Sequence, residues 1–185
     1  MSAICAPIRA LEQALVAEFE RDRKGTRAAQ ILSEYARTHA DWTEFALFDE
    51  AIYTRNLVGR NEHFEMLVLC WNVGQTSPIH NHAGQNCWMA VLQGEIEELQ
   101  FQAPPPGYVG RLVPGSSRTF GPGKVGFIND DIALHLVRPR AGEKGTSLHL
   151  YSRPIDTCNV YEESTGRIVP RKLAYHSVRG QLGRA

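Results

Sequence analysis

The sequence lacks several features that would assign it to a protein class directly. Its four cysteines show no CxxC pair and no zinc-knuckle spacing. No apolar run reaches the roughly 18 residues that a membrane-spanning helix needs. The N-terminal stretch has no basic region followed by an unbroken apolar block, so no secretory signal peptide is predicted. These absences favour a cytoplasmic protein with free thiols.

An excess of charge is also missing. Lys plus Arg and Asp plus Glu number 20 each, giving a formal net charge of +0 at neutral pH. No overall field then draws the chain to nucleic acid or to a membrane, and we expect neither partner. With 43% hydrophobic residues in 185, the sequence favours one globular domain over residues 1–185. We expect it to be a monomer.

Residues 1–50 are expected to form a helical cover. Pro7 suits the first turn of a helix, and apolar residues then recur at three- and four-residue steps: Ile8, Leu11, Leu15 and Phe19. Gly25 ends this helix, and a second helix carries Ile31 and Leu32. Asp41 is a candidate N-cap for a third.

Residues 51–165 are expected to form an all-β core, a small antiparallel barrel or sandwich. Short strand-like runs alternate with Gly, Pro, Ser and Asn. The run 64–73 is apolar on both faces, which predicts a strand inside the wall. Residues 108–114 read as a further strand and 115–117 as a turn. From Gly166 to the end lies a basic tail, expected to be solvated or strapped over the barrel: Arg167, Arg171, Lys172, Arg179 and Arg184.

Three histidines are the candidate metal ligands. His80 and His82 are two residues apart, so both rings would share one face of a strand. His135 lies inside the later run 132–139, where a histidine without a partner would more often be a hydrogen-bonded core residue. Three neutral imidazoles suit zinc with an open position, and also iron, copper, nickel or manganese.

Two further polar sets accompany the histidines. Ser147, His149 and Tyr151 alternate with leucines and therefore share one face, either as a buried hydrogen-bonded relay or as a solvent-facing row. Tyr53 and Arg55 also share a face, and a guanidinium turned into a barrel is suited to a carboxylate.

These residues carry a family resemblance. The spacing from Gly74 to Gly94, G(x)5HxH(x)4C(x)6G, resembles the first cupin motif, with Cys87 where most cupins have a metal-binding glutamate. The stretches YTRNLV, LCW, SPIHNH, INDDIALH, SLHLYS and DTCNVYEESTG together resemble the cysteine dioxygenase family from about Tyr53 to Gly166.

The resemblance implies a cupin barrel (jelly roll) in which His80, His82 and His135 hold Fe(II). It implies that L-cysteine binds iron through its thiolate and amine, that O2 takes the remaining position, and that cysteine sulfinate is the product. Arg55 would bind the substrate carboxylate with help from Tyr151 and Tyr53.

It also implies that Ser147 and His149 form a relay to Tyr151, and that Cys87 and Tyr151 can be joined by a thioether. A cysteine at position 87 leaves three protein ligands and three open metal positions, which suits a bidentate substrate plus O2.

Other functions stay open at this point. The same chemistry on 3-mercaptopropionate is the nearest alternative, although Arg55 and Cys87 favour cysteine. A zinc-dependent cupin hydrolase could use the same three histidines. A cupin binding or sensor module without turnover would be supported by a separate DNA-binding segment, and none is visible in the short N-terminal helices.

Overall fold

The computed structural model describes residues 6–183, so Cys5, expected to be a free thiol, and Arg184 of the basic tail lie outside the described residues. Two helices come first, α1 (Ala6–Arg21) and α2 (Ala28–Thr38), followed by the short 3₁₀ helix η1 (Asp41–Phe45). Asp41 does not cap η1, whose N-cap is Ala40. Instead its carboxylate accepts hydrogen bonds from the Ile8 backbone N–H and the Tyr35 hydroxyl, which ties α1, α2 and η1 together.

Twelve strands follow the helices. They are β1 (Thr54–Arg60), β2 (Glu65–Trp71), β3 (Cys87–Gln93), β4 (Ile96–Phe101), β5 (Pro114–Phe120), β6 (Val125–Ile128), β7 (Leu134–Pro139), β8 (Gly145–Tyr151), β9 (Thr157–Glu162), β10 (Arg167–Lys172), β11 (Ser177–Val178) and β12 (Gln181–Leu182). The predicted all-β core behind N-terminal helices is confirmed. Among residues 6–183, no helix is long and apolar enough to cross a membrane.

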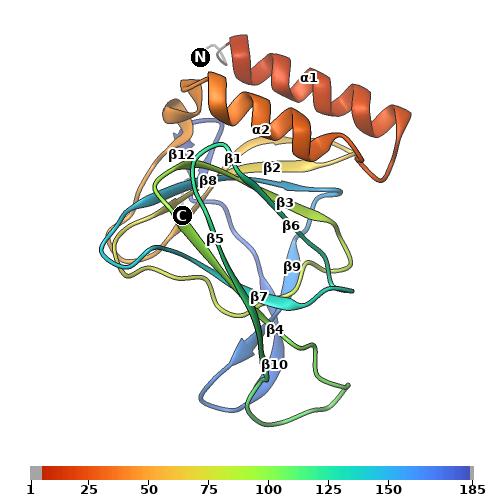
Figure 1. The fold of residues 1–185 in the computed structure, drawn as a ribbon, viewed down its shortest axis with the longest axis vertical. Helices are drawn as coiled ribbons and strands as arrows, with labels where there is room; N and C mark the ends of the chain where they lie inside the picture. Colours follow the sequence, from red (N-terminus) through yellow and green to blue (C-terminus); the bar gives the residue numbers. More distant parts are fainter. Residues whose placement is uncertain (1–5, 184–185) are drawn as a thin grey trace.

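The strands form three sheets. The largest has the order β12-β11-β1-β2-β8-β3-β6, a second has the order β5-β4-β7, and β9 pairs with β10. Figure 1 shows α1 and α2 lying together across the outside of the large sheet, with the smaller sheets on its other side. His80 connects the two smaller sheets, because it makes isolated β-bridges to His135 of β7 and to Val160 of β9.

The central strands of the large sheet are buried on both faces, as predicted for the run 64–73, except that Val73 at its end is 55% exposed. Alternate residues face the helices and form one apolar cluster, for example Met66 and Val68 of β2 and Leu148 and Leu150 of β8. The intervening residues, such as Leu67 of β2, face the barrel interior. The pleat of each strand thus contributes to two separate cores.

One predicted strand was wrong. Residues 108–113 form no strand, and the strand lies at β5, across the predicted turn of residues 115–117. β5 is exposed along most of its length and is held by backbone pairing with β4, including Leu99 opposite Ser117. β5 lies at the edge of its sheet and buries few side chains. It therefore lacks the alternation of apolar and polar residues on which the prediction relied.

The basic C-terminal segment is part of the sheets. β10 pairs antiparallel with β9, with Arg171 opposite Cys158. β11 pairs parallel with β1, which places Ser177 opposite Asn56. The segment therefore lies beside the strand that carries Arg55.

Candidate metal centre

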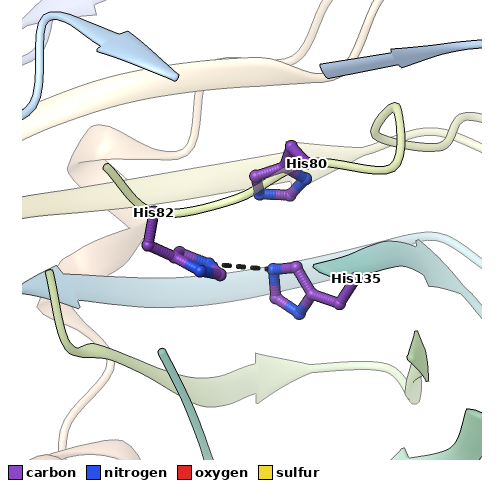
Figure 2. Close-up of side chains that lie close together, drawn as sticks. All are labelled: His80, His82 and His135. Atoms are coloured by element: carbon purple, nitrogen blue, oxygen red, sulfur yellow. Dashed lines mark hydrogen bonds between the residues drawn. The ribbon is translucent and has the colours of Figure 1, made fainter. Parts of the chain in front are cut away.

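His80, His82 and His135 come together inside the barrel. One ring nitrogen from each lies within 4.8 Å of the others. Figure 2 shows the three rings turned toward one common point, with His82 and His135 approaching each other directly. His82 and His135 are fully buried, at 0% and 2% exposed.

Loop geometry, rather than a continuous strand, positions the HxH pair. His80 makes β-bridges, but His82 lies outside any strand and is followed by a turn in which Ala83 and Gly84 have φ values of 51° and 77°. The Asp130 carboxylate holds this turn, accepting the backbone N–H groups of His82 at 2.6 Å and Gly84 at 2.7 Å. The strand periodicity used for the sequence prediction therefore applies at His80 only.

Hydrogen bonds fix the tautomers of two histidines. His80 Nδ1–H donates to the Pro78 carbonyl at 2.9 Å, and His135 Nδ1–H donates to the Glu98 carboxylate at 2.8 Å. In both rings Nε2 is then unprotonated and carries a lone pair. A buried carboxylate behind a ligating imidazole is a common arrangement in protein metal sites.

The donor atoms fit a metal ion. His82 Nε2 lies 3.0 Å from His135 Nε2, and His82 Nδ1 is buried without a hydrogen-bond partner among the described residues. If His82 carried its proton on Nε2, it would donate a hydrogen bond to His135 Nε2, but its own buried Nδ1 would have no hydrogen-bond partner. If the proton were on Nδ1, 3.6 Å from Asp130 Oδ1, two lone pairs would face each other. A cation bound by both Nε2 atoms at about 2.1 Å removes this conflict.

The electrostatics also suit a cation. Burial lowers the pKa of His80 to about 3, and burial together with the neighbouring histidines lowers the pKa of His135 well below its ordinary value. These imidazoles are neutral at neutral pH, the form in which they bind metals. Burial also raises the pKa of Glu98.

The predicted polar row of β8 faces this site. Ser147, His149 and Tyr151 are 0%, 3% and 2% exposed, so the solvent-facing alternative does not hold. The Ser147 hydroxyl lies 3.0 Å from His149 Nε2 and accepts a hydrogen bond from Trp71 Nε1. The His149 Nδ1 atom faces the Cys87 sulfur at 4.0 Å.

Tyr151 and Cys87 lie opposite each other on the adjacent strands β8 and β3. They are paired residues in the β3–β8 register, and the tyrosine interacts electrostatically with both the Cys87 thiol and the Arg55 guanidinium. Burial raises the pKa of the Cys87 thiol and that of the Tyr151 phenol, so both are protonated at neutral pH.

Arg55 lies at the other end of the site. Its side chain is 11% exposed, and its guanidinium carbon is 5.9 Å from the Tyr151 ring centroid. Tyr53 stacks on Trp71 with ring centroids 4.5 Å apart. A cavity of about 740 Å³ opens at Arg55 and Tyr53, and its rim includes Arg171 of β10.

Sequence reasoning missed the carboxylates behind these groups. They are Glu98, which holds His135, Asp130, which holds the His82 turn, and Glu65, which contacts Arg55. A partial signal existed for Glu98, since Ile96, Glu98 and Gln100 alternate on one face of β4. Because Glu97 is adjacent, the sequence did not show which of the two glutamates faces inward.

Comparison with known proteins gives the family. The family model described as cysteine dioxygenase type I matches residues 4–164. The chain belongs to the cysteine dioxygenase type I family. It is similar to cysteine dioxygenase type 1 of Rattus norvegicus, 37% identical over 152 residues that cover 81% of this chain and 76% of the rat protein. The Danio rerio protein of the same name is 34% identical over 166 residues, covering 88% and 83%.

A solved structure shares the fold. It is a crystal structure of an uncharacterized conserved protein with a double-stranded β-helix domain from Klebsiella pneumoniae. It aligns with a TM-score of 0.51 and 13% identity, covering 73% of this chain and 90% of that one. The likeness concerns the fold alone. The family resemblance and the cupin architecture inferred from the sequence are both confirmed.

Proposed function

We propose that the protein is a non-haem Fe(II) thiol dioxygenase that oxidises L-cysteine with O2 to cysteine sulfinate. The observation that carries this proposal is a set of three convergent imidazoles with a buried guanidinium beside it. Both atoms of one O2 molecule enter the product, so RSH plus O2 becomes RSO2H without another reductant.

Fe(II) is the proposed metal, held by His80, His82 and His135. Three nitrogen donors would hold the ion and leave the rest of its coordination shell for the substrate thiolate and amine and for O2. When bound, iron supplies the activation of O2 toward sulfur. The protein supplies neutral ligands, fixed in their tautomers by Pro78 and Glu98.

The remaining residues of the site orient the substrate. Arg55 binds its carboxylate, because a guanidinium offers paired N–H groups in a plane. The Tyr151 hydroxyl, in contact with Arg55, and Tyr53, at the cavity mouth, complete this end. Ser147 and His149 form a buried hydrogen-bonded pair that borders Cys87 and keeps that wall of the site rigid.

A thioether between Cys87 and Tyr151 belongs to the same proposal. The pair is already opposed across β3 and β8, so joining sulfur to the ring needs no change of strand register. The bond removes two hydrogen atoms from the protein, which O2 accepts as oxidant. Intact mass measurement of wild type and Cys87→Ser tests this: only wild type should lose the mass of two hydrogens after turnover.

Metal analysis and oxygen uptake test the proposed reaction. We expect activity to follow iron content, with cysteine consumed faster than 3-mercaptopropionate and one O2 used per sulfinate formed. Faster turnover of 3-mercaptopropionate would assign the alternative substrate. Full zinc occupancy without iron-dependent oxygen uptake would favour the hydrolase.

We further propose that the enzyme acts as a monomer in the cytoplasm. All the proposed site residues come from one chain, and Cys70, Cys87 and Cys158 form no disulfide among residues 6–183. Sedimentation of the iron-loaded protein should give a species of about the chain mass of 20.7 kDa.

A further inference from the structure

Glu65 is a buried carboxylate behind the proposed substrate-binding arginine. It begins β2 and is paired with Tyr151 across the β2–β8 register. It is 0% exposed, although glutamate is rarely buried without partners.

Four groups converge on this carboxylate. Its Oε1 atom lies 3.3 Å from Arg55 Nη2. Its Oε2 atom accepts the backbone N–H of Ile155 at 3.2 Å and lies 3.7 Å from Arg60 Nη1. The Tyr175 hydroxyl is also in contact with it. Glu65 therefore joins β1, the loop after β8 and the C-terminal segment around one end of the site.

The ion pairs continue outward from Glu65. Arg60 pairs with Asp156 at 2.9 Å and donates to the Tyr175 hydroxyl at 2.6 Å. Two arginines and two acids thus alternate from the cavity to the surface, with side-chain exposure of 11% at Arg55, 0% at Glu65, 32% at Arg60 and 74% at Asp156. The second arginine offsets the charge that Glu65 would otherwise bring to the substrate end.

The Arg55 guanidinium keeps an unpaired donor. Glu65 occupies Nη2, whereas Nε is buried and has no hydrogen-bond partner among residues 6–183. A buried donor without a partner is unfavourable unless a ligand supplies the acceptor. The contact with Glu65 therefore fixes one amino group of the guanidinium and leaves the buried Nε–H for an acceptor that a ligand would bring.

We propose that Glu65 is a positioning residue, which holds the Arg55 guanidinium in the orientation that receives the substrate carboxylate. This inference rests on the proposed function, in which Arg55 binds that carboxylate. Without the Glu65 charge, Arg55 and Arg60 repel each other across the vacated contact, and Arg55 loses its anchor. The consequence is weaker binding of substrates that carry a carboxylate.

The test uses the iron-loaded Glu65→Gln variant, which keeps the shape and removes the charge. We expect KM for cysteine to rise about tenfold, because the contact with Arg55 changes from a charge-assisted to a neutral hydrogen bond, with kcat changed less than twofold. Glu65→Asp, which keeps the charge on a shorter side chain, should recover part of the affinity. Glu95→Gln, which breaks the exposed Glu95–Arg140 pair, is the matched control and should behave as wild type.

Two comparisons separate positioning from a general structural role. In anaerobic titrations, Glu65→Gln should weaken binding of cysteine but not of cysteamine, which has the thiol and amine and lacks the carboxylate. In an Arg55→Ala background, Glu65→Gln should cause no further loss, because the residue acts through Arg55.

The outcomes are distinct. Unchanged or tighter cysteine binding in Glu65→Gln, or equal weakening of cysteine and cysteamine, overturns the positioning role. If Arg55→Ala itself leaves cysteine binding unchanged, the proposed carboxylate contact fails, whatever Glu65 does. Iron content and thermal unfolding of every variant identify any loss that comes from misfolding.

Discussion

The two faces of the large sheet are built from the same strands but differ in chemistry: the outer face is apolar, and the inner face carries polar side chains. Leu148 and Leu150 of β8 face α1 and α2 in a wholly packed apolar cluster. Ser147, His149 and Tyr151, which alternate with them, face the barrel interior beside the three histidines. The outer face contributes stability by burying apolar area, and the inner face carries polar groups whose burial has to be compensated by partners. The comparison predicts that substitutions on the two faces separate stability from activity.

The largest effect is expected on the inner side, at His135. His135→Ala removes one proposed ligand and one of the two side-chain donors to the buried Glu98 carboxylate, leaving Gln100 as the other. We expect loss of bound iron and of oxygen uptake together, measured by metal analysis and an oxygen electrode. His63→Ala, at a histidine outside the site, is the control. Iron retained at wild-type level in His135→Ala would show that another residue is the third ligand.

Substitutions on the outer face should lower the free energy of unfolding and leave activity unchanged. Leu148 is 0% exposed in the helix-facing cluster, so Leu148→Ala leaves a cavity there. We expect the free energy of unfolding to fall by about 2–5 kcal/mol, measured by urea denaturation, with KM for cysteine unchanged. A variant that stayed as stable as wild type but lost activity would contradict the separation of the two faces.

Arg55 gives a smaller and more selective effect. Arg55→Ala removes the charge-assisted contact with the substrate carboxylate, worth about 1.5–3 kcal/mol, so KM for cysteine should rise roughly 10- to 100-fold. Steady-state oxygen uptake measures it, and Arg138→Ala, in an exposed ion pair with Glu97, is the control. An unchanged KM would exclude Arg55 from substrate binding.

The smallest expected effect is a pH dependence confined to the inner face. Burial lowers the pKa of His149 well below its ordinary value of about 6.5. The unfolded chain therefore binds a proton first as pH falls below about 6.5, and stability is lost there by up to about 1.4 kcal/mol per pH unit. In metal-free protein, His149→Gln should lose less stability than wild type between pH 7.5 and 5.5. The destabilisation caused by Leu148→Ala should be the same at both pH values.

Local sequence spacing was sufficient for part of this site. The alternation of SLHLY placed three polar side chains on one strand face, and the HxH pair with His135 gave a candidate ligand set. The first prediction rests on the period of two residues within one strand. The second rests on motif spacing, because His82 lies outside any strand and His135 belongs to a separate segment. The family followed from the same motifs. The error at residues 108–117 came from an edge strand, where that periodicity is absent.

The sequence by itself determined the helical cover, the strand-rich core, the three candidate histidines and the family to which the chain belongs. Only the tertiary structure decided which carboxylates support them: Glu98 lies 37 positions from His135, and Asp130 lies 48 from His82. Glu65 likewise meets Ile155 from 90 positions away. The reason is physical, because a buried charge is stable only beside its partners, and those partners come from strands that meet only when the barrel closes.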